Sequence, residues 1–201
     1  MSTWFTADLH LGHANMLRIA NRPFETVGEM NDWLIDAIND RVCTTDTLWI
    51  LGDFAFRVRR EDVLAYRKRI NCRHIFLVRG NHDSHFAEGA SPFQEEHNYV
   101  DNLHSPRPNR RRLVLCHYPI MDWNGAAHGS IHLHGHIHAS ASYNERNRAC
   151  GILRYDVGVD ANGYEPVRLE DVLGFFEGVE PQLSSIHSEL NAETHTATVQ
   201  M

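Results

Sequence analysis

The sequence predicts an α/β fold, a sandwich of mixed β-sheets flanked by helices. Short apolar runs alternate with helix-like segments in the first half of the chain, whereas strand-like runs cluster in the second half. Several of the apolar runs stop at a glycine or run directly into a histidine, as a strand does when it ends in a loop. A fully parallel, doubly wound sheet would instead alternate strands and helices throughout.

The first half of the chain contains two predicted strands and two predicted helices. Residues 3–7 are β-branched and aromatic, which predicts a buried strand that runs into a loop. Apolar residues recur at helical spacing over residues 27–42, which predicts a helix with one buried face. Residues 48–51 form a continuous apolar run, typical of a strand that is covered on both faces. A second helix is predicted over residues 61–70.

The second half of the chain is richer in strands. The apolar runs 75–78, 113–116 and 131–134 repeat the buried-strand pattern. Residues 153–157 predict a further strand, with antiparallel pairing to its neighbour as the expected arrangement. A last helix is predicted over residues 169–176.

The domain is predicted to end near Gly178. We expect one domain over residues 1–178, because 201 residues is the length of one domain or of a domain with an appendage. Residues 179–201 are rich in Ser and Thr and predict a polar C-terminal tail.

Composition narrows the classes of function. A formal net charge of -7 opposes stable binding to long nucleic acids, because such binding depends on many cations that neutralise phosphates. Fifteen histidines exceed what packing requires, and imidazole is the commonest metal ligand. The composition therefore favours a metal site that acts on small substrates over a protein that binds long nucleic acids.

The expected location is cytoplasmic. The four cysteines are widely spaced, and none forms a Cys-x-x-Cys pair, so a reduced environment fits best. Met1 leads straight into an apolar stretch without a basic region followed by a long apolar segment. We therefore expect neither a signal peptide nor a membrane span. The oligomeric state is left open.

Candidate metal ligands follow nearly every apolar strand. In an open α/β sheet the carboxyl ends of neighbouring strands lie along one rim, where ligands bind. Residues that are far apart in the sequence are therefore expected to converge there. The candidates are Asp8 and His10 after the first strand, Asp53 after the second, Asn81 and His82 after the third, His117 after the fourth, and His136 and His138 after the fifth.

Spacing strengthens this prediction. In extended backbone, residues i and i+2 point to the same side, so Asp8 with His10 and His136 with His138 can each reach one site together. Glycines directly precede several candidates and permit a close backbone approach. The donors comprise three or four imidazoles, two carboxylates and one amide oxygen. That set has more donors than one four-coordinate zinc ion can bind, and it suits two divalent metals that share a carboxylate.

The five elements together resemble the signature of the calcineurin-like metallophosphoesterases. The elements are Asp8-Leu9-His10, Gly52-Asp53, Gly80-Asn81-His82-Asp83, His117, and Gly135-His136-Ile137-His138. The match spans about residues 3 to 140. Asp8-Leu9-His10-Leu11-Gly12-His13, followed by Asn15 and by Arg22-Pro23-Phe24, is closer still to the small single-domain bacterial and phage phosphoesterases.

The resemblance implies a role for each matching residue. Asp8, His10 and His138 would hold the first metal, and Asn81, His117 and His136 the second. Asp53 would bridge the two, and His82 would be a catalytic residue beside the substrate, not a ligand. Manganese is the expected metal, with iron, zinc, nickel and magnesium as alternatives, because the mixed N and O donors do not decide among them.

One departure separates the chain from the protein phosphatases of this superfamily. In those enzymes the Gly-Asp element continues into an Asp-Arg pair, whose Asp orients the catalytic histidine. Here Phe56 stands at the position of that Asp, followed by Arg57. Whether Asp83 replaces it is left open, and Arg57 is a candidate phosphate contact with a surface salt bridge as a nearly equal alternative.

Several other polar residues lie near these elements. His13 and His134 flank the candidate ligands and could contact substrate or only support other residues. Arg107, Arg110, Arg111 and Arg112 form a basic cluster, for which a solvated loop is favoured over phosphate recognition.

The predicted activity is dinuclear, metal-dependent hydrolysis of phosphodiesters, with nucleotides or cyclic nucleotides as candidate substrates. Two metals activate water as hydroxide and neutralise charge on the phosphoryl oxygens. Cleavage of a phosphomonoester metabolite is the enzymatic alternative. A non-catalytic scaffold of the same fold is the alternative from another class, and the complete ligand set argues against it.

Overall fold

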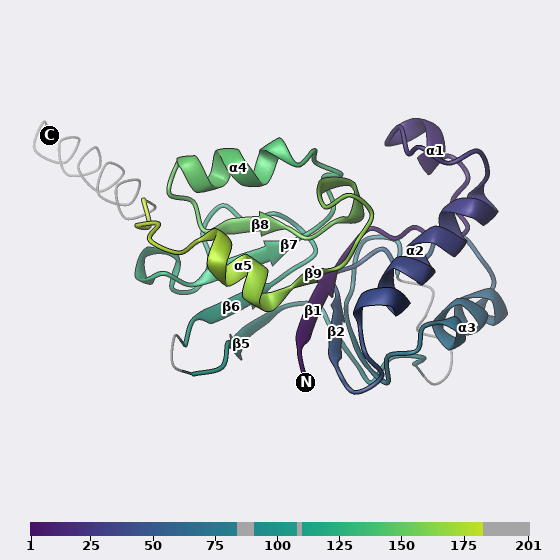
Figure 1. Cartoon of the computed structure of the whole chain (residues 1–201), viewed down its shortest axis with the longest axis horizontal. Helices are drawn as coiled ribbons and strands as arrows, with labels where there is room; N and C mark the ends of the chain where they lie inside the picture. Colours follow the sequence, from purple (N-terminus) through teal and green to yellow (C-terminus); the bar gives the residue numbers. More distant parts are fainter. Residues whose placement is uncertain (84–90, 108–109, 183–201) are drawn as a thin grey trace, which may run out of the picture.

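The described chain folds into two β-sheets packed face to face and flanked by helices (Figure 1). The computed structural model describes residues 1–83, 91–107 and 110–182, so nearly all of the predicted polar tail lies outside the described residues. The expected sandwich with mixed sheets is confirmed.

The first sheet has five strands in the order β4-β3-β2-β1-β9. Neighbouring strands among β4, β3, β2 and β1 are parallel, and β9 is antiparallel to β1. The strands are β1 (Thr3–Thr6), β2 (Thr47–Ile50), β3 (His74–Val78), β4 (Glu95–His97) and β9 (Val167–Arg168). The predicted strands at residues 3–7, 48–51 and 75–78 are therefore present, within one residue at each end.

The second sheet has four strands in the order β5-β6-β7-β8. The strands are β5 (Val100–His104), β6 (Arg112–Leu115), β7 (Ile131–His134) and β8 (Arg154–Asp156). Only β5 is antiparallel to its neighbour. The strand predicted at residues 153–157 is present as β8 but pairs parallel with β7, so the antiparallel arrangement is wrong.

Helices cover the outer faces of both sheets (Figure 1). The helices are α1 (Met16–Ile19), α2 (Val27–Arg41), α3 (Arg60–Arg69), α4 (Ser142–Ala149) and α5 (Leu169–Phe175), with short 3₁₀ helices η2 (Ala126–His128) and η3 (Val159–Ala161). Helix α2 begins after Thr26, whose hydroxyl accepts a hydrogen bond from the Glu29 backbone N–H at 3.1 Å, as an N-cap does. No described helix has both the length and the apolarity to cross a membrane.

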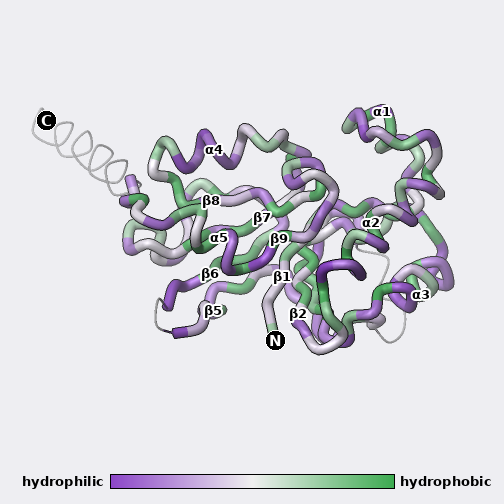
Figure 2. Tube along the Cα trace, in the orientation of Figure 1, coloured by the Kyte–Doolittle hydropathy of each residue, from purple (hydrophilic) through white to green (hydrophobic). Residues whose placement is uncertain are grey.

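The alternation of side chains along β2 explains how the first sheet joins two cores. Trp49 and Leu51 face the second sheet, whereas Leu48 and Ile50 face the helices. A strand buried on both faces reads as a continuous apolar run, which is the pattern seen in the sequence. Figure 2 shows hydrophobic segments among the strands at the centre of the molecule and hydrophilic stretches along α3 and α4.

Candidate metal centre

The carboxyl ends of the strands bring the predicted ligands together where the two sheets meet. Parallel pairing of β1, β2 and β3 places the loops that carry Asp8, His10, Asp53 and Asn81 at one edge. The loops after β6 and β7 bring His117, His136 and His138. The sheets are joined at this edge by a hydrogen bond of 2.9 Å from the His136 backbone N–H to Asp8 Oδ2.

Two groups of side chains have the spacing of metal ligands. Ligand atoms of Asp8, His10 and His138 all lie within 4.8 Å of one another, and so do those of Asp8, Asp53 and His117. The first group matches the ligands that the resemblance implies for the first metal. Asp8 is common to both groups.

The other two predicted ligands lie beside His117. Asn81 Oδ1 is 3.0 Å from His117 Nε2. The ring centroid of His136 is 5.0 Å from that of His117. These contacts bring together the three residues expected at the second metal.

Asp53 belongs to the second of these groups and also contacts His10 of the first. Its Oδ2 is 3.5 Å from His10 Nε2 and also 3.5 Å from His117 Nε2. Two ligands that are each about 2.1 Å from one ion in tetrahedral geometry are about 3.4 Å apart. The spacing on both sides of Asp53 is therefore that of ligands that share an ion.

The backbone at this edge is strained. The non-glycine residues with φ between +46° and +75° include Asp8, His10, Asp53, His136 and His138, which are five of the seven predicted ligands. Such conformations cost about 1 to 3 kcal/mol each and cluster at functional sites. The backbone at the Asp8/His10 and His136/His138 pairs is therefore left-handed, and the extended conformation assumed from their spacing is wrong.

Close backbone approach at the glycines is confirmed. Gly52 has φ +95°, and a Cβ atom there would overlap the ring of His117. A Cβ atom at Gly80 would overlap Asp53, and one at Gly135 would overlap Asp8. Only glycine lets the backbone approach these ligands so closely.

The donor atoms fit divalent cations. Asp8 Oδ1 and both ring nitrogens of His10 are buried and have no hydrogen-bond partner among the described residues. Burial lowers the pKa of His10 to about 2, so its ring is neutral and able to ligate a metal. Burial, followed by the charges of Asp156 and Asp53, raises the pKa of Asp8 well above its usual value. A cation among these carboxylates would offset that repulsion.

Hydrogen bonds orient two of the ligand rings. His117 Nδ1 is 2.8 Å from the Leu51 carbonyl oxygen, and His138 Nδ1 is 2.7 Å from Asp160 Oδ2. In each case the contact leaves Nε2 as the nitrogen able to bind an ion.

His82 lies beside the ligand groups. Its backbone N–H donates to Asp53 Oδ1 at 2.9 Å, and its Nε2 is 3.9 Å from Asp53 Oδ2. Its side chain is 36% exposed, whereas the side chains of His10 and His117 are buried. A partly exposed imidazole next to the ligands is accessible to a substrate.

Asp83 organises the backbone around Asp53. Its carboxylate accepts hydrogen bonds from the backbone N–H groups of Asp53, Phe54 and Gly80, at 2.8, 3.1 and 2.8 Å. Burial raises the pKa of Asp83 to about 7. Both oxygens of the carboxylate are therefore engaged by the loop that carries Asp53.

An aromatic stack lies next to His82. The rings of Phe56 and His13 stack with centroids 3.7 Å apart, and the ring of His82 meets Phe56 edge-on at 4.7 Å. The guanidinium of Arg57 lies over Phe56 at 5.1 Å. Arg57, another residue with positive φ, thus lies against the aromatic ring that contacts His82.

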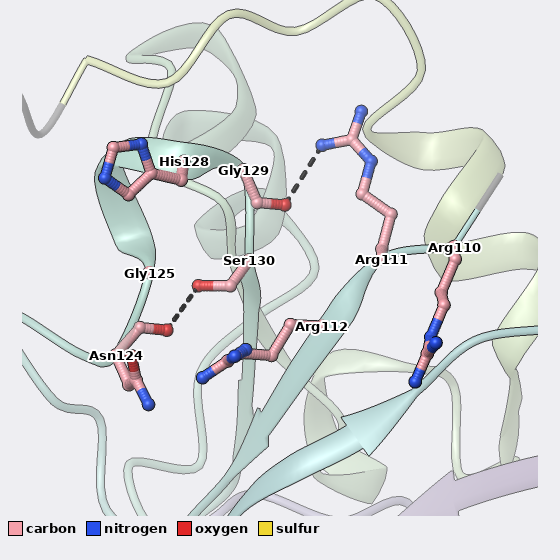
Figure 3. Close-up of a pocket in the computed structure, with 8 residues that line it drawn as sticks. All are labelled: Arg110, Arg111, Arg112, Asn124, Gly125, His128, Gly129 and Ser130. Carbon is pink, nitrogen blue, oxygen red and sulfur yellow. Dashed lines mark hydrogen bonds between the residues drawn. The ribbon is translucent and has the colours of Figure 1, made fainter.

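Figure 3 shows three residues of the basic cluster, Arg110, Arg111 and Arg112, beside the loop that carries His128 and Gly129. They lie at the start of β6, away from the end that leads to His117. Arg112 begins β6, five residues before His117, and a strand rises about 3.3 Å per residue. A pocket of about 250 Å³ separates the cluster from the loop around η2. There Arg111 donates to the Gly129 carbonyl at 3.1 Å, while the side chain of Arg110 points away from that loop.

His134 is a buried structural residue. Its Nδ1 is 2.8 Å from the Gly135 carbonyl oxygen and its Nε2 is 3.2 Å from the Tyr143 hydroxyl. These contacts place it among the residues that support the site.

The sequence interpretation missed three charged residues next to the ligands. Arg22 bonds to Asp160, which contacts His138, and Asp156 is a buried charged neighbour of Asp8. Asp156 is the last residue of β8, so the strand-end pattern that identified the ligands applies to it as well. Arg22 belongs to the Arg22-Pro23-Phe24 element, but its partner is 138 residues away in the chain.

A family model and two relatives match most of the chain. The family model described as calcineurin-like phosphoesterase matches residues 1–169. An uncharacterized protein of Methanocaldococcus jannaschii is 27% identical over 179 residues, covering 87% of this chain and 90% of its own. The Gene 66 protein of Mycobacterium phage L5 is 28% identical over 193 residues, covering 81% and 88%.

A solved structure supports the fold. The crystal structure of a protein of unknown function from Aquifex aeolicus aligns with a TM-score of 0.66 and 21% identity, over 86% of this chain and 98% of its own.

Proposed function

The chain belongs to the calcineurin-like phosphoesterase family, which makes it a metal-dependent phosphoesterase, and from that premise we propose that it hydrolyses phosphodiesters with two divalent metals. The observation that carries the proposal is the contact of Asp53 with a proposed ligand of each metal, with His82 accessible beside them.

We propose the following ligands and roles. Asp8, His10 and His138 would hold the first metal, Asn81, His117 and His136 the second, and Asp53 would be shared between them. Two ions held there would supply an acidified water as nucleophile and would neutralise charge on the phosphoryl oxygens. Manganese is the proposed metal, and iron, zinc, nickel and magnesium suit the same donors.

His82 is the proposed catalytic residue of the chain. Its backbone is tied to Asp53, and its exposed ring can reach the departing oxygen of a substrate held at the metal centre. Donation of a proton to that oxygen is general-acid catalysis, which typically contributes about 10² to 10⁴-fold.

The surroundings of His82 favour a diester over a phosphoprotein. Phe56 stands where protein phosphatases carry the Asp that orients the catalytic histidine, and Asp83 is engaged by backbone N–H groups. Arg57 is the cation that Phe56 holds nearby. A diester carries one negative charge and needs less cationic support than a monoester dianion.

The proposed substrates are small, with nucleotides and cyclic nucleotides as candidates. A small phosphoester suits this chain better than a long nucleic acid, because the chain has a formal net charge of -7. We also propose a cytoplasmic location, which four free cysteines support. A phosphomonoester metabolite remains the second candidate substrate, since its dianion would bind two metals strongly.

The substrate proposal is tested with matched chromogenic esters. We expect the metal-loaded enzyme to cleave bis-p-nitrophenyl phosphate with a higher kcat/KM than p-nitrophenyl phosphate. The assay should be repeated with manganese, iron, zinc, nickel and magnesium, so that low activity with an unsuitable metal is not attributed to the substrate. A clear preference for the monoester with the most active metal would reject the diesterase proposal.

A further inference from the structure

A buried ion pair joins Arg22, in the loop between α1 and α2, to Asp160 in η3, next to the first ligand group. The Nε and NH2 groups of Arg22 donate to Asp160 Oδ1 and Oδ2, both at 2.9 Å. Arg22 is only 3% exposed, and the side chain of Asp160 is 7% exposed. A planar guanidinium paired with both carboxylate oxygens has a fixed geometry, which suits a structural support.

The same guanidinium holds the backbone of the first ligand. Arg22 NH2 also donates to the Asp8 carbonyl oxygen at 2.7 Å, and NH1 donates to the Leu9 carbonyl oxygen at 3.1 Å. Asp8 has φ 58°, a conformation that persists only when its surroundings impose it. Arg22 thus stabilises the turn that points Asp8 at the site.

Asp160 in turn orients the third ligand of this group. Its Oδ2 accepts a hydrogen bond of 2.7 Å from His138 Nδ1. The same carboxylate forms the bidentate ion pair with Arg22. A charged acceptor on Nδ1 makes the opposite nitrogen, Nε2, a stronger metal ligand.

The second ligand group has weaker support of this kind. The Nδ1 atom of His117 contacts the neutral carbonyl oxygen of Leu51. Among the described residues, the ion pairs of His117 involve Asp53, through Nε2, and no carboxylate lies within 4.0 Å of its Nδ1.

From this asymmetry we propose that Arg22 and Asp160 are positioning residues that strengthen metal binding by Asp8, His10 and His138, so that the two metal sites differ in affinity. The proposal rests on the dinuclear site of the proposed function. Loss of such a supporting partner typically weakens metal affinity by about 10 to 100-fold.

The test is a metal titration of the chelator-stripped full chain. Free Mn²⁺ is followed by electron paramagnetic resonance, which yields a Kd for each ion without any substrate. In Asp160→Asn we expect one of the two ions to bind about 10 to 100-fold more weakly. We expect the affinity of the other ion to be unchanged.

Asp32→Asn is the matched control. It removes the same charge from an exposed pair with Arg69, away from the ligands, and should leave both affinities unchanged. Thermal unfolding of the metal-free proteins shows whether a variant has lost its fold. If Asp160→Asn does not fold, Asp160→Glu keeps the charge but displaces the carboxylate, and the same selective weakening is expected.

Arg22→Lys tests the other half of the pair. Lysine keeps the positive charge but lacks the planar fork that reaches Asp160 and two carbonyl oxygens together. The weaker of the two ions in Asp160→Asn should also be the weaker one here, whereas Arg69→Lys should change neither.

The outcomes separate this proposal from the proposed function. Unchanged affinities in folded Asp160→Asn, or equal weakening of both ions, would overturn the positioning role while leaving a dinuclear phosphoesterase intact. A wild-type chain that bound one ion would contradict the dinuclear function. Selective loss of that single ion in Asp160→Asn, but not in Asp32→Asn, would still support the role of Asp160.

Discussion

Asp53 contacts a proposed ligand of each metal, so its substitution is expected to affect both ions. Its Oδ2 lies 3.5 Å from a histidine of each group. Asp53→Asn keeps the shape but removes the charge, so we expect both ions to bind more weakly and the activity to fall. Metal content and kcat measured on the same preparation check this. A variant with near-normal content and rate would contradict the bridging role.

His82 is expected to matter for chemistry and not for metal content. Its ring lies beside the ligands and is accessible. His82→Ala should therefore retain both ions while losing activity, and His128→Ala, at an exposed histidine far from the centre, should change neither. Loss of metal together with activity would show that His82 is a ligand.

The leaving group distinguishes two roles for His82. p-Nitrophenolate departs readily without a proton, so the loss from His82→Ala should be smaller on bis-p-nitrophenyl phosphate than on an alkyl or nucleoside diester. General-acid help of about 10² to 10⁴-fold sets the scale of that difference. Equal losses on both substrates would indicate that His82 stabilises phosphoryl charge instead.

The proposed ligands were predictable residue by residue, but their supporting residues were not. The ligands follow apolar strands, and that pattern is visible in the sequence. The role of Arg22 arises from a contact with Asp160 that only the tertiary structure creates. The sequence left open whether Asp83 orients His82, and the structure shows that its oxygens accept backbone hydrogen bonds from Asp53 and Phe54.

At the scale of the elements, predictability depended on apolar patterning. Strands with continuous apolar runs were predicted within about one residue. Helix α4 was missed because its buried residues are Asn144 and Asn147, which bind the backbone of β8 and leave no apolar stripe. Strands β4 and β9 are too short, at three and two residues, to show a period.

Strand β7 carries a buried histidine that should make the fold sensitive to acid. Burial lowers the pKa of His132 to about 4, although the carbonyl groups of Val114 and Tyr118 favour the charged form. The unfolded chain binds this proton near pH 6.5. Between about pH 6.5 and pH 4 the unfolded state therefore holds more protons, and the free energy of unfolding falls as the pH falls.

This pH effect is measured by denaturant unfolding of the metal-free chain. A lowered pKa at His132 contributes a slope of at most about 1.4 kcal/mol per pH unit over that window. Work on the metal-free protein prevents loss of metal from being read as loss of this contribution. Asp8 and Asp83 have raised pKa values that act in the opposite direction, so the contribution of His132 is the difference in slope between the wild-type chain and His132→Gln. Equal slopes in the two chains between pH 6.5 and pH 4 would contradict the buried, neutral state of His132.

For the whole molecule, the centre depends on both sheets. Asp8, His10, Asp53 and Asn81 come from the first sheet, and His117, His136 and His138 from the second. We propose that residues 1–178 form the domain that carries the site. Residues 179–182 add to it, because Val179 packs on the core and the Gln182 backbone N–H donates to the Gly151 carbonyl at 3.0 Å.

The central claim is that this chain is a two-metal enzyme, and metal stoichiometry measured together with chelation tests it most directly. We expect elemental analysis to find about two divalent ions per chain, because seven donors in two groups favour occupancy. Phosphoesterase activity should be lost with a chelator and restored when metal is added back. One ion or none per chain, together with activity that survives chelation, would contradict the account.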